Sequence, residues 1–410
     1  MRACASPAPL STAGLLAAAP HRPLFLAGAL AVLTSMAWWT LELASLRLRW
    51  PAWPQPPVPP GWAHAVLIQY GMLPMFVFGF LLTTFPRWLD RPPVPPRRYL
   101  AVAGTVFCGY LLSHLGLLGM PWLLRAGVAT MLAGYLAGVS ALAGVLRAAA
   151  RRNPHAWSCL AALGLGALGP AAFLGFLFGA PAGCARLAVK LGTFGLLVPV
   201  YFTVAHRMVP FFSGNVVAGY VVRRPAWSLP LAWPLLLAHL GLDLAHRPAW
   251  LWAVDAPLAL LFGGHALAWQ PWKAMRPGLL AVLHLAFAWL PVAFALYAMQ
   301  SLYLALGHAP VLGLAPLHAL TIGYFGSMLV AMVTRVTQGH SGRPLQMGAI
   351  PWLCFALLQG VVLLRVWSEL ARDTYLWLVA AACGWLVAFL PWVLRSAWIC
   401  LTPRADGRPG

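Results

Sequence analysis

The chain has 410 residues, of which 61% are hydrophobic and only 8% are charged. A soluble globular protein usually carries about 25% charged residues, so this chain is neither a water-soluble enzyme nor a disordered polypeptide. The composition is typical of a polytopic membrane protein whose apolar side chains face lipid. The net charge of +20 comes from residues that stand singly or in pairs between apolar runs. No basic stripe and no nucleic-acid-binding motif is present, so the charge does not indicate a nucleic-acid-binding protein.

Twelve runs of about 20 apolar residues follow one another along the chain, each long enough to cross the hydrocarbon core as a helix. We predict helices because lipid leaves every backbone polar group to be paired within the segment, and the alternating polarity of a barrel strand is absent. The fold is therefore predicted to be all-α, a polytopic membrane helical bundle. The spans are expected at 23–46, 62–85, 98–119, 122–147, 157–180, 185–206, 227–245, 249–269, 278–300, 311–335, 349–370 and 374–397.

Lys and Arg are distributed unevenly between the two sides of this predicted bundle. The side that carries the termini holds 19 of them, and the other side holds 8. Because positively charged loops stay in the cytoplasm, both termini are predicted to be cytoplasmic. The domain organisation is then a tail at 1–22, one twelve-helix domain at 23–400 and a tail at 401–410. Small-residue pairs such as Gly134/Gly138 and Gly175/Gly179 predict close helix packing.

Histidines within the predicted spans are the main functional signal, because ionisable groups at membrane depth are costly and mark functional sites. Each one alone is also explained by hydrogen bonding between helices, but their number exceeds what that role requires. The helical rise of about 1.5 Å per residue separates His284 from His318 by roughly 15 Å in depth, and His64 from His318 by only about 5 Å. Two ligands of one metal lie within roughly 4 Å of each other, so His64 and His318 are the depth-matched candidates.

The stretch from residue 318 to residue 344 combines several candidate groups. Gly323 and Gly326 leave one helix face bare for a flat macrocycle or for a neighbouring helix. Met328 and Met332 are four residues apart and are potential ligands for copper or haem, although this spacing more often serves packing.

The same stretch ends in polar residues near the predicted cytoplasmic face. Arg335 and Arg343 are candidates to pair haem propionates or an oxyanion, and positive-inside anchoring explains them equally well. His340 lies between them. In the seventh span, His239 and Asp243 share a helix face, as a metal-ligating histidine and its carboxylate would, or as a plain interfacial pair would.

Several motifs resemble, in order along the chain, those of the NnrS family of haem- and copper-containing bacterial membrane proteins. The similarity spans nearly the whole chain, and the motifs together are more specific than any one of them. The matching stretches are HRP at 21–23, GFLLTTFP at 79–86, RMVPFF at 207–212, LHLAFAW at 283–289, HALTIG and GHSGRP within 318–344, and PRADGRPG at 403–410.

The resemblance implies a multi-pass protein of the bacterial cytoplasmic (inner) membrane that is linked to denitrification and to nitric oxide stress. It implies haem and copper as cofactors and nitric oxide as a candidate ligand, with membrane lipids as partners and no nucleic acid. Haem iron commonly takes imidazole as its axial ligand, so His318 is the first candidate, with His64 as its partner. His284 and His340 are candidates for a second, inner metal site or for propionate contacts beside Arg335 and Arg343.

One departure from the family pattern concerns the start of the second span. The family has a stretch similar to HxHEM, whereas this chain reads His64-Ala65-Val66-Leu67-Ile68. The first histidine is kept, and Val66 and Leu67 replace a histidine and a glutamate. This loss weakens the expectation of copper more than that of haem.

Three other functions stay open at this point. A secondary transporter fits twelve helices and the prolines within them, but no internal repeat and few membrane carboxylates are visible. A haem–copper oxidase subunit needs several histidines at one depth. A non-catalytic membrane assembly protein would leave its histidines dispersed.

Overall fold

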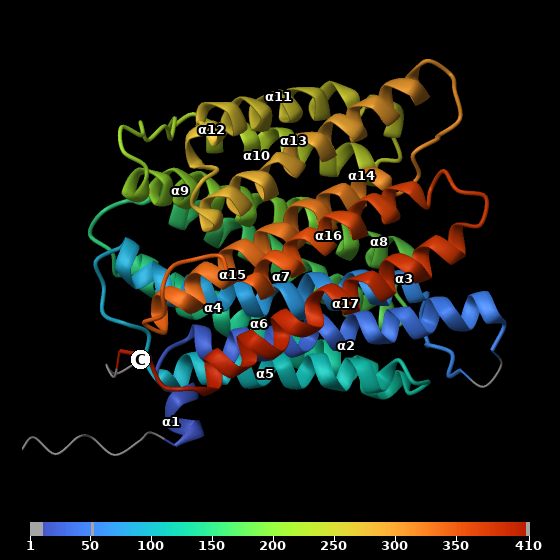
Figure 1. Ribbon diagram of the computed structural model, residues 1–410. Helices are drawn as coiled ribbons and strands as arrows, with labels where there is room; N and C mark the ends of the chain where they lie inside the picture. Colours follow the sequence, from blue (N-terminus) through green and yellow to red (C-terminus); the bar gives the residue numbers. More distant parts are fainter. Residues whose placement is uncertain (1–10, 51–52, 407–410) are drawn as a thin grey trace, which may run out of the picture.

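The computed structural model describes residues 11–50 and 53–406. Its long helices lie side by side along one axis and form a single bundle (Figure 1). Helices make up every regular element of the described chain. The first ten residues of the expected N-terminal tail and the last four residues of the C-terminal motif lie outside the described residues.

All twelve expected helices are found in the described chain, three of them interrupted by a π-helical segment. Ten are long and apolar enough to span a membrane, and α10 and α11 are shorter apolar helices. Their bounds are α2 (His21–Leu48), α3–η1–α4 (Pro60–Val66, Leu67–Met72 and Leu73–Trp88), α5 (Pro96–Gly116), α6 (Pro121–Arg147), α7 (Pro154–Leu177), α8–η2–α9 (Ala182–Lys190, Leu191–Leu197 and Val198–Val216), α10 (Ser228–Leu244), α11 (Trp252–Ala268), α13 (Gly278–Ala305), α14–η4–α15 (Ala315–His318, Ala319–Gly326 and Ser327–His340), α16 (Ala349–Trp367) and α17 (Thr374–Leu401).

The end of the sixth predicted span and several short helices differ from the sequence-based prediction. The sixth helix was expected to end at 206 but continues to Val216, because Met208, Val209 and Pro210 are buried and hold this turn in the bundle. The short helix α1 (Thr12–Leu16) lies within the expected N-terminal tail. Two further short elements, η3 (Pro248–Trp250) and α12 (Pro271–Ala274), lie in the connections that flank α11.

Proline begins many of these helices. The helices α3, α5, α6 and α7 all start at a proline. Proline suits the first helical position because its fixed φ is already helical and because the N–H at that position has no partner within the helix. The proline-rich connections therefore mark helix starts as well as helix ends.

The three π-interrupted helices form the centre of the bundle. In their apolar windows, 89% of the residues are buried in Pro60–Trp88, and 78% in both Ala182–Val216 and Ala315–His340, against 33–61% in the other seven spans. A proline follows both η1 and η2, at Pro74 and Pro199, where its missing N–H interrupts the regular ladder. Single π-helical turns within α-helices occur frequently at functional sites, so the centre of the bundle is where a site is expected.

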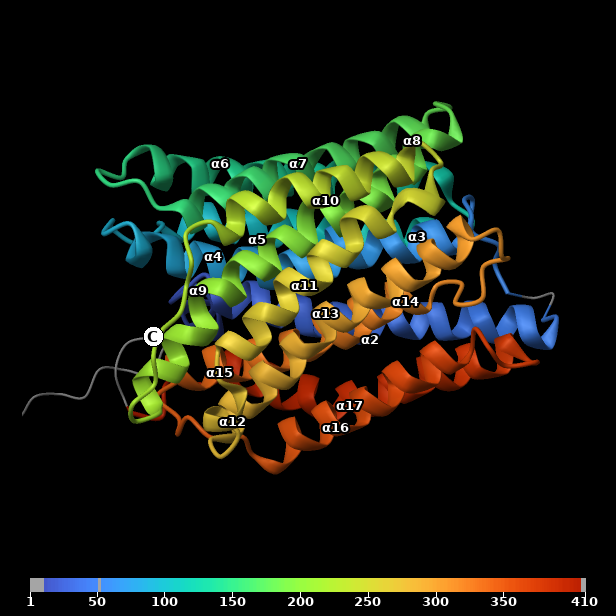
Figure 2. The same ribbon diagram turned by 90° about the horizontal axis from the view of Figure 1, so that it is seen from above.

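Both ends of the described chain lie at the same end of the bundle (Figure 1). The guanidinium of Arg22 donates hydrogen bonds to the carbonyl oxygens of Cys400 (3.1 Å) and Thr402 (3.0 Å). The first and last long helices, α2 and α17, pack against each other. Figure 2 shows α6 and α7 on one side of the bundle and α16 and α17 on the opposite side. This arrangement agrees with an even number of crossings, and the cytoplasmic location of the two ends stays a prediction.

Candidate functional site

A cavity of about 120 Å³ lies between the three π-interrupted helices and α2, α16 and α17. Each π segment or its immediate end contributes to the wall, as shown by Ile68, Leu197 and Thr321. We call it the histidine cavity. Its principal polar lining residues are His64, Gln69, His318, Thr321 and Arg365.

His318 occupies the last position of α14, directly before the π segment η4. Its Nδ1 lies 3.0 Å from the carbonyl oxygen of Leu314. A carbonyl only accepts, so Nδ1 carries the proton and Nε2 keeps its lone pair. Metal-bound histidines are typically oriented in this way by a second hydrogen bond.

His64 reaches the same cavity from α3, on a different helix. Its ring stacks on that of Trp39, with ring centroids 4.3 Å apart and an interplanar angle of 21°. Its Nδ1 is buried and has no hydrogen-bond partner. His64 is therefore held by stacking alone, whereas a hydrogen bond orients His318.

Two lining residues were not singled out from the sequence. Arg365 donates to the carboxylate of Glu369 at 2.6 Å and to the hydroxyl of Ser368 at 2.8 Å. The side-chain amide of Gln69 donates to Thr193 Oγ1 at 2.9 Å and so ties η1 to η2. The i,i+4 spacing of Arg365 and Glu369 was a signal in the sequence, because such pairs share a helix face. Nothing in the sequence marked Gln69.

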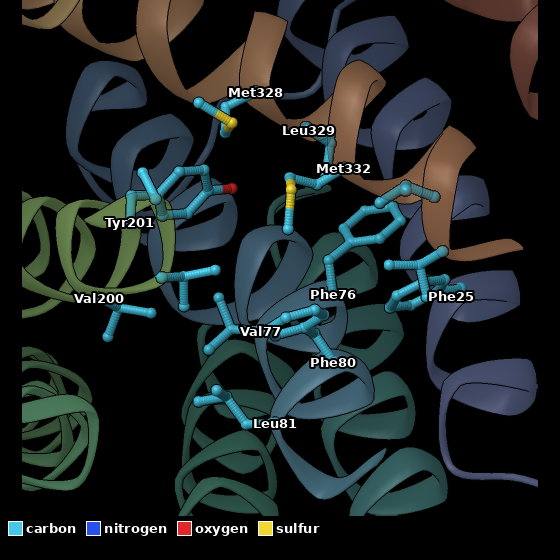
Figure 3. Close-up of a pocket in the computed structure, with 14 residues that line it drawn as sticks. Phe25, Phe76, Val77, Phe80, Leu81, Val200, Tyr201, Met328, Leu329 and Met332 are labelled. Carbon is cyan, nitrogen blue, oxygen red and sulfur yellow. The ribbon is translucent and has the colours of Figure 1, made fainter. Parts of the chain in front are cut away.

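A second, apolar cavity of about 60 Å³ adjoins the histidine cavity, and Leu329 lines both. Met328 and Met332 project into it opposite Phe76 and Tyr201 (Figure 3). Neither methionine shares this cavity with a histidine. The two thioethers therefore line an apolar space, which agrees with the packing interpretation.

The other predicted cofactor residues do not line the histidine cavity. His284 is 5% exposed, and its Nε2 lies 3.2 Å from the hydroxyl of Ser213. The ring of His340 lies 4.5 Å from the ring of His21 at the end of the bundle where the described chain ends. His284 and His340 thus contact different residues, and the inner site stays a prediction.

The two predicted arginines contact aromatic rings at that same end. The guanidinium of Arg335 lies 4.0 Å from the centroid of the Phe212 ring. That of Arg343 lies 4.7 Å from the Trp398 ring, and its Nη2 donates to Thr402 Oγ1 at 3.2 Å. Neither residue lines the histidine cavity.

The expected pairing of His239 with Asp243 is wrong. His239 Nδ1 lies 2.6 Å from Asp255 Oδ1 on the neighbouring helix, and both side chains are fully buried. Asp243 instead pairs with Lys190 at 2.5 Å and with Arg186 at 3.3 Å. The rotation of α10 turns the two residues toward different neighbours, although they lie one turn apart.

Three further histidines meet beside the middle of α9. His206 Nδ1 lies 3.0 Å from His155 Nε2, and its ring lies 5.4 Å from that of His265. Both nitrogens of His265 are engaged, by the Leu261 carbonyl and the Ser228 hydroxyl. With both nitrogens engaged, His265 has no lone pair free for a metal, whereas His206 Nε2 is buried without a hydrogen-bond partner. The group joins neighbouring helices through hydrogen bonds.

The donor set of the histidine cavity fits haem better than it fits a bare metal ion. Within residues 11–50 and 53–406, no three His, Cys, Asp or Glu side chains come together as a metal cage. Haem iron needs only one or two axial ligands from the protein, and two imidazoles from different helices line this cavity. Ligand pockets usually exceed roughly 300 Å³, so a macrocycle would require the cavity walls to move apart.

Comparison with known proteins connects this geometry to a family. The sequence matches the family described as NnrS protein over residues 15–404. The chain belongs to the NnrS family. That family is linked to the nitric oxide response, and the matched region includes every helix that lines the histidine cavity. A search of curated proteins finds no match.

The departure of this NnrS protein from the family pattern lies next to the histidine cavity. Val66 and Leu67 are 1% and 2% exposed and pack in the apolar core at the junction of α3 and η1. An imidazole and a carboxylate at these positions would face protein rather than water. In this chain the two positions supply no ligand, and His64 is the part of the motif that still reaches the cavity.

Proposed function

We propose that this NnrS protein binds haem in the histidine cavity and binds nitric oxide there, as part of a bacterial response to nitric oxide and denitrification. The protein would lie in the cytoplasmic membrane with both ends in the cytoplasm. His318 would be the residue that holds the haem, and His64 would be a second, exchangeable ligand. Copper stays an expectation from the family, because the described part of the chain brings together no group of three or more metal-ligating side chains for it.

One observation carries this proposal: two imidazoles from separate helices line one cavity and keep nitrogens without hydrogen-bond partners. His318 is oriented by Leu314, whereas His64 is held only by its contact with Trp39. This asymmetry supports His318 as the residue that would hold the haem firmly and His64 as the one that would be held less firmly. When bound, haem supplies an iron that coordinates the gas.

The neighbouring apolar cavity supports the choice of ligand. It shares Leu329 with the histidine cavity and is lined by Met328, Met332 and several aromatic rings. An uncharged diatomic molecule needs no hydrogen-bond donors on its path, and an apolar space of this size admits it while excluding ions. Nitric oxide that dissolves in the membrane would reach the histidine cavity through the apolar cavity.

Histidine variants of the full-length protein test the ligand assignment. His318→Ala is expected to abolish the Soret band of protein purified in detergent, because the oriented imidazole is lost. His64→Ala is expected to keep haem but to alter the band, because only the exchangeable ligand is removed. Absorption spectra of the oxidised and dithionite-reduced protein measure both effects.

His284→Ala is the matched control, since it removes a buried histidine outside the histidine cavity. Its spectrum should equal that of the wild type. The ligand assignment fails if His318→Ala keeps a wild-type spectrum, or if His284→Ala loses haem while His318→Ala does not.

A further inference from the structure

A larger cavity, of about 390 Å³, lies at the end of the bundle that carries both ends of the described chain. It opens between the end of α9, the start of α13, the end of α15 and the connection from α15 to α16. We call it the arginine cavity; its charged and polar lining residues are Arg276, Arg335, Gln346 and Trp352. Its volume falls within the roughly 300–1,000 Å³ of ligand pockets.

Arg335 is a buried cationic side chain that forms no ion pair with an Asp or Glu of the described residues. Its side chain is only 9% exposed and lines the arginine cavity, and its guanidinium stacks on Phe212. No hydrogen bond or ion pair joins it to the described residues, whereas buried Arg365 has Glu369 and buried Arg22 has two carbonyls. A buried charge is unfavourable unless it is paired, and the five N–H donors of the Arg335 guanidinium have no acceptor among the described residues.

The N-terminus of α13 lies at the same cavity. Helix α13 is 28 residues long and has no side-chain cap, and Gly278, Leu279 and Leu280 line the cavity. The first turn of a helix carries the positive end of its dipole, and its first N–H groups usually have no partner within the helix. In α13 the N–H groups of Leu280 and Ala281 donate to the Pro277 carbonyl, so those of Gly278 and Leu279 are the free donors. Gly278 also lets the backbone approach closely, since a Cβ there would lie 2.8 Å from that of Met347.

The charge and position of the cavity define the ligand. No Asp or Glu lines it, and its two charged residues are both arginines. Guanidinium groups together with a helix N-terminus form the usual protein site for phosphate. Trp352, which lines this cavity, is 38% exposed, and exposed tryptophans are typical of the depth of lipid headgroups.

We propose that the arginine cavity binds a phosphate group, carried by an anionic phospholipid headgroup or present as free phosphate. Arg335 forms the inner wall and donates to the phosphate oxygens, together with the N–H groups of Gly278 and Leu279. Arg276, at the exposed rim, adds the second positive charge. The site is separate from the histidine cavity and does not depend on haem.

Thermal unfolding of the full-length protein in neutral detergent tests this site. The probes are inorganic phosphate, short-chain phosphatidylglycerol and a diacylglycerol that lacks phosphate. At least one phosphate-bearing probe is expected to raise the midpoint of unfolding, whereas diacylglycerol does not. Stabilisation by the lipid alone identifies a headgroup site, and stabilisation by both phosphate probes identifies the phosphate itself as sufficient.

Arg335→Gln is expected to weaken the apparent affinity by about tenfold or more, because a charge-assisted hydrogen bond is lost. Arg152→Gln, which changes an exposed arginine outside the cavity, should bind as the wild type does. Should Arg335→Gln not fold, Arg276→Gln at the exposed rim provides the second variant with the same expected direction. Equal stabilisation by all three probes, or unchanged affinity in the folded arginine variants, would overturn the proposal whatever the haem content.

Discussion

His239 and Asp255 form a hydrogen-bonded pair from which water is excluded. Both side chains are fully buried, and the other polar atom of each, His239 Nε2 and Asp255 Oδ2, has no partner. The rings of Phe194 and Tyr297 surround the imidazole at centroid distances of 3.8 and 5.3 Å. The pair therefore joins α10 to α11 in an apolar setting.

Removing one partner of this pair should destabilise the protein more than removing both. Asp255→Leu leaves a buried imidazole without its acceptor and is expected to lower stability by about 3 kcal/mol. The double variant His239→Phe with Asp255→Leu should recover much of this loss, since no unpaired polar group remains. Thermal unfolding of the purified variants measures both effects, and a double variant less stable than Asp255→Leu would contradict this account.

At the scale of residues, the sequence predicts the depth of a side chain in the membrane better than it predicts which side chain of another helix it contacts. The helical rise places His64 and His318 at similar depth, and the structure has both in one cavity. The choice of Asp255 over Asp243 depends on how α10 rotates against α11, which no single-helix pattern contains. The positions of Gln69 and Arg365 in the cavity depend in the same way on the packing of distant helices.

At the scale of elements, α5 and α6 show how small residues bring helices together. A Cβ added at Gly109 would collide with the backbone of Met131, and one added at Gly134 would lie 2.7 Å from the backbone nitrogen of Val106. Gly138 likewise faces the ring of Phe78. The prediction of close packing is therefore confirmed for Gly134/Gly138.

Glycine variants within α5 separate packing from helix propensity. Gly109→Ala is expected to lower stability by about 1–3 kcal/mol, because the added methyl group meets backbone that does not move easily. Gly104→Ala in the same helix is the control, since nothing lies within 4 Å of its added Cβ. That variant should be neutral or more stable, because alanine favours the helix by about 1 kcal/mol. Equal thermal stability of the two variants would contradict the packing argument.

The same spacing does not always have the same meaning. Gly175/Gly179 also matches the small-residue pattern, but the nearest atom to a Cβ at Gly175 is Ala180 Cβ at 3.8 Å. Gly179 has a φ of +101° and ends its helix instead. The prediction of close packing is wrong for this pair, because spacing alone does not show which helix face meets a neighbour. The sequence does not predict the π segments either, because their apolar residues continue the pattern of an ordinary α-helix.

At the scale of the whole molecule, composition together with the length of the apolar runs predicts the membrane bundle: the few charges exclude a soluble fold, and the runs of about 20 residues indicate helices. The order of the spans and the family motifs follow from the sequence as well. The internal cavities do not, since each is formed by residues far apart in the chain. The central helices carry the histidine and apolar cavities, and the bundle end carries the arginine cavity.

The central claim is that the histidine cavity holds haem and that this haem binds nitric oxide. The most direct measurement is the absorption spectrum of the purified wild-type protein, reduced with dithionite and titrated with nitric oxide, together with its haem-to-protein ratio. The account predicts a Soret band at about one haem per chain that shifts as nitric oxide is added. A chain that carries no haem, even after reconstitution with added haem, would contradict the account.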